Sequence, residues 1–188
     1  MENPYIDVLR LKDIIAVGTP VKVAFLDCDG VMNNKKMYDN QRIKKILKKG
    51  RTGDYIFDPS SCLLLNKLVQ KSNLLLFISS DIRNDVINGK QFLPAMVEVF
   101  AQNGICEKPV GITPFLYDTE NNPERGKEID YVLSTLGQKG MIIERYVILD
   151  DFDEFILPHQ KEYFVKCNSE KGFQEEEYLL AERILMGD

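Results

Sequence analysis

The chain is poor in the side chains that build zinc sites, disulfide frameworks and membrane spans. It has one histidine in 188 residues, and its four cysteines, Cys28, Cys62, Cys106 and Cys167, form no C-x-x-C pair. A zinc site is therefore not expected, and reduced thiols are. No apolar run approaches the ~20 residues that a membrane-spanning helix needs, and the first residues lack a basic and then apolar signal sequence. We expect a cytoplasmic protein without membrane contact.

The chain also lacks an excess of positive charge. Its net charge is −5, so the molecule as a whole does not attract nucleic acid or an anionic membrane. Apolar residues make up 44% and charged residues 28%, which is ordinary for a globular protein and excludes wholesale disorder. A chain of 188 residues is long enough for one domain with a substantial core. We expect a single domain over residues 1–188.

One segment departs from this acidic balance. Residues 35–51 contain eight basic side chains and one acidic one, and the rest of the chain carries a net −12. Ile43, Ile46 and Leu47 have helical spacing, which predicts a small amphipathic helix with a cationic outer face. Two interpretations remain open: a solvated surface, or a positive rim that attracts a polyanionic substrate. The basic residues are Lys35, Lys36, Arg42, Lys44, Lys45, Lys48, Lys49 and Arg51.

Short apolar runs alternate with helical patterns along the chain. This alternation predicts an α/β fold, with a parallel sheet covered by helices on both faces. The expected strands are 22–27, 74–79, 146–150 and 163–167. A helix is expected to begin at Asp58-Pro59, and others lie near 91–103, from Asn122-Pro123 to Gly137, and over about 174–186.

Polar side chains follow three of these strands. Asp27 and Asp29 follow the first, Ser79 and Ser80 the second, and Asp150 with Asp151 the third. The carboxyl ends of parallel strands share one edge of a sheet, where ligands bind, so these groups are expected to converge. Crowded carboxylates repel one another, and a divalent cation relieves the repulsion.

Two cations lie where a helix would not ordinarily favour them. Arg125 and Lys127 occupy the first turn of the helix that follows Asn122-Pro123. A positive charge there opposes the helix dipole, which favours a functional role over a structural one. We take Arg125 as the first candidate for a functional cation at the site and keep Lys127 as the alternative.

The run Val23–Val31, four apolar residues and then Asp27-Cys28-Asp29-Gly30-Val31, resembles the first motif of the haloacid dehalogenase (HAD) superfamily. Further short sequence motifs follow in the order found in one branch of this superfamily. The chain is similar to the HAD domains of Swiss-army-knife RNA-repair proteins, relatives of the phosphatase half of polynucleotide kinase–phosphatases. The resemblance covers about residues 20–186. One departure is Ile82, where that family usually has tryptophan. The further blocks are Phe57-Asp58-Pro59, Leu65–Leu68, Ser79–Arg83, Val110–Pro114, Arg125–Ile129 and Tyr146–Asp151.

The resemblance implies a Rossmann-like HAD sheet with a core over about 20–34 and 57–188 and a small cap insert over about 35–56. It also implies roles. Asp27 would attack phosphorus and form an aspartyl-phosphate, and Asp29 would donate a proton to the leaving group and then activate water. Mg²⁺ would be held by the Asp27 carboxylate, the Asp29 carbonyl and Asp151, with Asp150 as the neighbour of Asp151.

The remaining positions of the resemblance imply contacts with the substrate. Ser79 would hydrogen-bond a phosphoryl oxygen, with Ser80 in its place if the strand ends one residue later. Arg125, or Lys127, would neutralise charge near Asp27, and Arg83 would bind substrate.

The expected function is that of a Mg²⁺-dependent phosphomonoester hydrolase, with nucleic-acid ends or nucleotides as candidate substrates, the former through the basic insert 35–51. The alternatives are a small-metabolite phosphatase and a HAD-fold binding or regulatory protein that holds metal without turnover. A phosphorylated substrate is the expected partner, and no protein partner is evident from the sequence.

Overall fold

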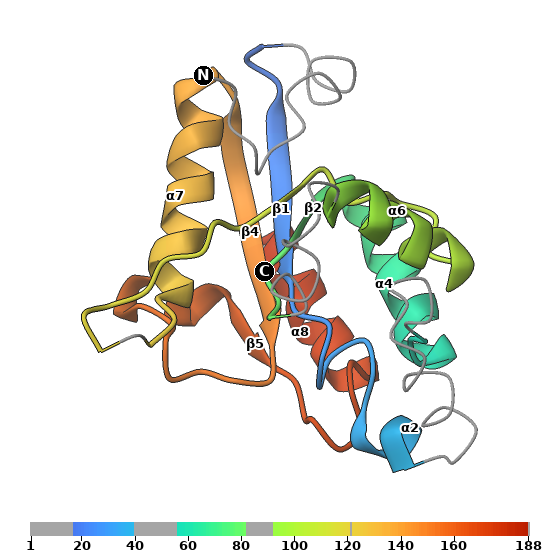
Figure 1. Cartoon of the computed structure of the whole chain (residues 1–188). Helices are drawn as coiled ribbons and strands as arrows, with labels where there is room; N and C mark the ends of the chain where they lie inside the picture. The colour runs from blue at the N-terminus through green and yellow to red at the C-terminus, as the bar shows by residue number, and fades with distance from the viewer. Residues whose placement is uncertain (1–16, 40–55, 82–91, 121, 188) are drawn as a thin grey trace.

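A computed structural model of the chain describes residues 17–39, 56–81, 92–120 and 122–187. Within them, five parallel strands form one sheet in the order β3-β2-β1-β4-β5 (Figure 1). The first strand lies at the centre, and the chain adds strands first on one side of it and then on the other. A crevice forms at the carboxyl ends of the strands where this order reverses. The strands are β1 (Pro20–Leu26), β2 (Leu74–Ile78), β3 (Gly111–Ile112), β4 (Ile142–Asp150) and β5 (Phe164–Lys166).

Helices cover both faces of this sheet. One of them, α7, packs on one face, and α4, α6 and α8 pack on the other (Figure 1). This arrangement confirms the predicted α/β class with a parallel sheet. The α-helices are α2 (Lys35–Asp39), α4 (Pro59–Ser72), α6 (Phe92–Gln102), α7 (Arg125–Gln138) and α8 (Glu175–Met186), and η2 (Pro158–Tyr163) is a 3₁₀ helix.

The strands alternate between two hydrophobic clusters because successive side chains of a strand point to opposite faces. In β1, Ala24 and Leu26 belong to the cluster beneath α4, α6 and α8. Val23 and Phe25 belong to the cluster beneath α7. All four side chains are fully buried, so a shift of β1 by one residue would exchange the faces on which they pack. The register of β1 therefore also fixes the direction in which the residues after the strand leave the sheet.

The predicted start of α4 is confirmed, and it ties this helix to the loop after β1. Asp58 Oδ1 accepts hydrogen bonds from the Ser60 and Ser61 backbone N–H groups at 2.8 and 3.4 Å, with Pro59 at the first helical position. Its other carboxylate oxygen accepts a bond from Asn34 Nδ2 at 3.0 Å. One side chain therefore caps the helix and holds the loop that carries the first motif.

Two features of the sheet differ from the sequence-based expectation. The strand β4 begins at Ile142, earlier than the predicted 146, because its largely exposed first half pairs with Pro20–Lys22 across a shift in register. The short strand β3 was not predicted, since Gly111-Ile112 is too brief to show a strand period.

Only the first part of the predicted cap insert falls on described residues, where Lys35–Asp39 form α2. Residues 40–55, with most of the basic side chains, lie outside the described residues, as does Arg83. Among the helices that the structure describes, none is long and apolar enough to cross a membrane.

Candidate active site

The carboxyl ends of the central strands bring three carboxylates together. Asp27 follows β1, and its backbone N–H donates to the Leu149 carbonyl of β4 at 2.9 Å, which holds the ends of the two strands side by side. Asp150 ends β4, and Asp151 follows it. One carboxylate oxygen from each of the three lies within 4.8 Å of the other two, so the group has the spacing of a metal site. This cluster is called the carboxylate triad below.

The turn after β1 is shaped around this triad. Gly30 has φ +80°, and a Cβ atom built on it would lie 2.2 Å from Asp151 Oδ2. Asn33 organises the same turn, since it donates to Asp29 Oδ1 at 3.0 Å and accepts from the Gly30 N–H at 3.3 Å. The glycine of the first motif is thus needed for its backbone conformation and for the space that Asp151 occupies.

Burial makes full ionisation of the triad costly. It raises the pKa of Asp27 well above its ordinary value, and the neighbouring charge of Asp150 raises it further. Burial also raises the pKa of Asp150 to about 6, although the Arg125 charge opposes the shift. The pKa of Asp151 is raised as well, chiefly by burial. Three oxygen donors whose charges repel one another fit a hard divalent cation such as Mg²⁺, which would stabilise their ionised forms.

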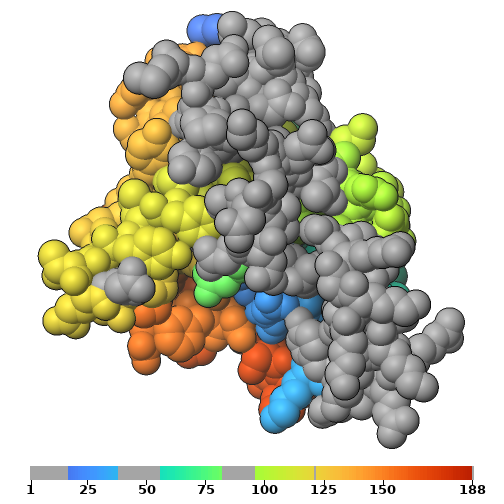
Figure 2. Space-filling view, in the orientation of Figure 1, coloured from blue at the N-terminus to red at the C-terminus, as the bar shows by residue number. Residues whose placement is uncertain are grey.

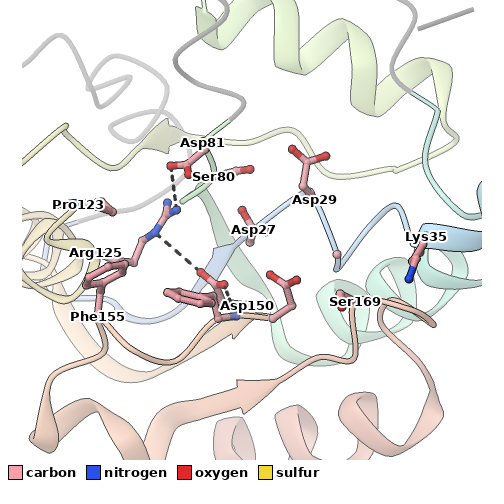
Figure 3. A pocket seen from close by; sticks show the side chains of 13 residues that line it. Asp27, Asp29, Lys35, Ser80, Asp81, Pro123, Arg125, Asp150, Phe155 and Ser169 are labelled. Atoms are coloured by element: carbon pink, nitrogen blue, oxygen red, sulfur yellow. Dashed lines mark hydrogen bonds and ion pairs between the residues drawn. The ribbon is translucent and has the colours of Figure 1, made fainter. Parts of the chain in front are cut away.

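Arg125, the first residue of α7, supplies a cation beside the triad. Its side chain is only 11% exposed, and its Nε lies 3.9 Å from Asp150 Oδ2. Its Nη2 lies 3.2 Å from Asp81 Oδ1, and its Nη1 donates to Ser79 Oγ at 3.4 Å. The guanidinium therefore stays charged and has three partners, of which Figure 3 shows Asp81 and Asp150.

A buried polar chain lies behind Arg125. Thr113 Oγ1 lies 3.5 Å from Ser79 Oγ and donates to Glu128 Oε2 at 3.3 Å. Glu128 also accepts from the Leu116 N–H at 3.1 Å, and its side chain is buried. This network links the end of β2, the segment after β3 and the first turn of α7, and Arg125 contacts it through Ser79.

Strand alternation separates the two serines. Ser80 lines the pocket that contains the triad, whereas Ser79 lies behind it in the buried polar chain. The Ser80 hydroxyl also lowers the pKa of Asp27, against the larger effect of burial. Of the two, Ser80 is the one within reach of a group bound in the pocket.

The pocket has a volume of about 440 Å³, which is within the range of small-molecule sites and larger than a phosphoryl group needs. Asp29 lies on its wall with an exposed side chain. Lys127 does not line it. The Lys127 side chain is 59% exposed, and its ammonium pairs with Glu124. In the space-filling view, the loop after β1 (blue) and the loop after β4 (orange) meet, next to the segment after β3 (yellow) (Figure 2).

Seven lining residues were not among the predicted site residues, and two of them, Gly30 and Asp81, lie within the motif blocks of the sequence. Lys35 and Ser169 form one side of the pocket, and Pro123, Phe152 and Phe155 form the other. Of the other five, Phe152 carried a sequence signal because it directly follows the carboxylate pair at the end of β4, and Lys35 belonged to the basic segment interpreted as a possible positive rim. The rest belong to loops or helix ends that no strand-end argument reaches.

Comparison with known proteins gives one match. A family model described as the HAD domain in Swiss Army Knife RNA repair proteins matches residues 23–178, which include every residue of the triad and Arg125. No curated protein and no solved structure matches the chain.

Proposed function

Because the chain belongs to the family of HAD domains found in Swiss Army Knife RNA repair proteins, we propose that it is a phosphomonoester hydrolase that acts through Asp27. Membership supports a hydrolase of the phosphatase type. The observation that carries the specific proposal is the carboxylate triad facing Arg125 in a single pocket.

The first step transfers the phosphoryl group to the protein. An Asp27 carboxylate oxygen attacks phosphorus, the bond from phosphorus to the ester oxygen breaks, and protonated Asp29 gives its proton to that leaving oxygen. Arg125 lies where the charge on the phosphoryl oxygens develops, and the Ser80 hydroxyl donates a hydrogen bond to one of them. Asp29 is placed to reach the leaving oxygen, because its side chain lies on the pocket wall outside the triad.

The second step releases phosphate. Asp29 takes a proton from a water molecule, whose oxygen attacks phosphorus, and the bond between phosphorus and Asp27 breaks. Inorganic phosphate leaves, and both aspartates return to their starting forms.

The carboxylate triad fits Mg²⁺, and we assign Asp27, Asp151 and the Asp29 carbonyl as its direct ligands. Asp150 is engaged elsewhere, since its Oδ1 accepts from the Phe152 N–H at 2.9 Å and its Oδ2 faces Arg125, which supports a positioning role. Bound Mg²⁺ supplies charge neutralisation between the nucleophile and the phosphoryl oxygens.

Nucleic-acid ends and nucleotides are the substrates we propose, in line with the RNA-repair description of the family and with the eight basic residues in 35–51. The proposal is tested by incubating the protein with Mg²⁺ and a panel of phosphomonoesters that includes nucleotides and 3′- and 5′-phosphorylated oligonucleotides. We expect Mg²⁺-dependent release of phosphate that is abolished in Asp27→Asn and by chelation. If wild type and Asp27→Asn are equally silent across the panel, the protein binds without turnover.

A further inference from the structure

Two aromatic side chains form part of the pocket wall. Phe152 is 49% exposed and Phe155 is half-buried, and both line the cavity that contains the triad. Their ring centroids lie 5.5 Å apart at an interplanar angle of 46°. Neither ring belongs to the two hydrophobic clusters that hold the sheet and helices together. We call Phe152 and Phe155 the aromatic wall.

The backbone on either side of these rings is anchored. The Phe152 N–H donates to Asp150 Oδ1 at 2.9 Å, directly beside the triad. The Phe155 carbonyl accepts from the Gly126 N–H at 3.0 Å, at the first turn of α7 and next to Arg125. Gly126 allows this close approach, because a Cβ atom there would lie 2.6 Å from Leu157 Cγ and 2.9 Å from the Phe155 oxygen. An anchored backbone reduces the entropy that these residues lose when a ligand stacks on their rings.

The two sides of the pocket differ in chemistry. Phe155 lies beside Arg125, and Lys35 and Ser169 lie on the other side of the carboxylates (Figure 3). A ligand that places a phosphate against Arg125 and Ser80 therefore meets aromatic rings on one side only. Among phosphomonoesters, a nucleotide joins a phosphate to a planar aromatic group, and every nucleobase has a face that stacks on an aromatic side chain.

We propose that the aromatic wall is the binding site for the base of the terminal nucleotide, so that Phe152 and Phe155 select nucleotides and nucleic-acid ends over sugar phosphates. This inference rests on the proposed function, since it places the phosphate of the same ligand at Asp27. It assigns the wall no part in the chemical step.

Binding is measured without turnover, in full-length Asp27→Asn protein with Mg²⁺. The probes are 2-aminopurine riboside 3′- and 5′-monophosphates, whose fluorescence is quenched when the base stacks. The chain has no tryptophan, so the probe is excited without interference from the protein. We expect saturable quenching by at least one probe. The substitution Phe152→Leu, added to the Asp27→Asn protein, keeps an apolar side chain but removes the aromatic face. We expect it to raise the Kd of that probe about ten-fold, the size of effect that one base–aromatic stacking contact predicts.

Tyr117→Leu is the matched control. Tyr117 is 46% exposed and stacks on Phe115, and it is not among the residues that line the pocket. Both variants replace an exposed aromatic ring by leucine, and both are expected to keep the thermal unfolding midpoint of the parent. Equal Kd values for the two variants would overturn the proposal, as would ribose 5-phosphate displacing the probe as well as AMP does. If phosphotyrosine displaced the probe as well as AMP does, the proposal of a nucleobase site would also be overturned. The aromatic wall would then bind the phosphorylated tyrosine of a protein substrate.

The failure of this inference can be told apart from the failure of the proposed function. Turnover that is equal for nucleotides and sugar phosphates, with quenching absent, would leave a phosphatase without a base site. Quenching that depends on Phe152, with no turnover by wild type, would leave a nucleotide-binding site without the enzyme.

Discussion

At the scale of single residues, the site depends on contacts that leave no room for a substitute. Gly30 is the sharpest case, because the volume that a side chain would fill there is taken by the Asp151 carboxylate. Arg125 is the other, since three separate partners hold its guanidinium. A change at either position is expected to alter the site more than the fold.

Gly30→Ala is expected to remove most of the phosphatase activity and most of the rise in Tm that Mg²⁺ produces, because the new methyl group displaces Asp151 from the triad. Gly104→Ala is the matched control. Gly104 also has a positive φ, +73°, but no atom lies within 4 Å of the position that a Cβ would take there. Both variants carry backbone strain of about 1 kcal/mol, so their difference isolates the contact with Asp151. If Mg²⁺ raised the Tm of Gly30→Ala as much as that of wild type, a side chain at position 30 would not displace Asp151, and this prediction would be wrong.

Arg125→Lys is expected to lower kcat by about 10²-fold, because an ammonium cannot reach the three partners of the guanidinium fork. Lys127→Ala is expected to keep most of the activity, since the Lys127 ammonium is exposed and pairs with Glu124. Steady-state kinetics on one chromogenic phosphomonoester compares the two variants. The reverse order of effects would make Lys127 the cation of the site.

At the scale of elements, the loops that form the site are held by helix ends. The Asp58 cap joins the start of α4 to Asn34 in the loop after β1, and the first turn of α7 binds the loop after β4 through Gly126. Gln160 in η2 strengthens the second connection, as its Nε2 donates to the Gly126 carbonyl at 2.9 Å and to Asp130 Oδ1 at 2.8 Å. The helices thus position both edges of the pocket.

Asp58→Ala is expected to lower the free energy of unfolding by about 1 kcal/mol near neutral pH, and Asp58→Asn by less, because asparagine also caps helices. Burial tends to raise the pKa of Asp58, but the hydrogen bonds from Ser60, Asn34 and Ser61 hold it below its ordinary value. A lowered folded-state pKa adds stability that is complete above the unfolded-state pKa and is lost as the pH falls through the folded-state value.

Urea unfolding as a function of pH checks this prediction. The gap between wild type and Asp58→Asn is expected to stay constant from neutral pH down to about pH 5 and to narrow below about pH 4, where the unfolded-state carboxylate takes up its proton. A gap that does not change with pH would show that the charge of Asp58 contributes nothing to the cap.

At the scale of the whole molecule, charge is distributed unevenly along the chain. Residues 35–51 are strongly basic, while the remainder carries a net −12. The pocket also combines the two signs of charge, since both carboxylates and Lys35 line it. The Lys35 ammonium lies 2.7 Å from Glu170 Oε1.

Reversing Lys44, Lys45, Lys48 and Lys49 to glutamate is expected to raise the KM for a phosphorylated oligonucleotide several-fold and to flatten its dependence on salt, because fewer counterions are released on binding. These lysines lie outside the described residues, so the prediction rests on their charge alone. The KM for a small phosphomonoester serves as the control and is expected to stay the same. An equal rise for both substrates would make the segment structural.

The amino-acid sequence was sufficient to predict the parallel sheet, its central strands and the start of α4. These features are local, since burial, strand alternation and a capping side chain act over a few neighbouring residues. The meeting of Asp27, Asp150 and Asp151 could also be predicted, because parallel strands end at the same edge. What the sequence determined about this protein is therefore its sheet and the carboxylates at the end of it.

Only the tertiary structure decided which of two neighbouring candidates faces the pocket. Ser79 and Ser80, like Arg125 and Lys127, differ by the direction in which a side chain leaves its strand end or helix turn, and packing of separate elements settles that direction. Phe152, Phe155, Lys35 and Ser169 were assigned to the pocket for the same reason. Phe152, Phe155 and Ser169 lie in loops, which have no period that predicts where a side chain points, and Lys35 begins α2. Backbone hydrogen bonds between segments far apart in the chain hold two of these places, from the Gly126 N–H to the Phe155 carbonyl and from the Lys35 N–H to the Ser169 carbonyl.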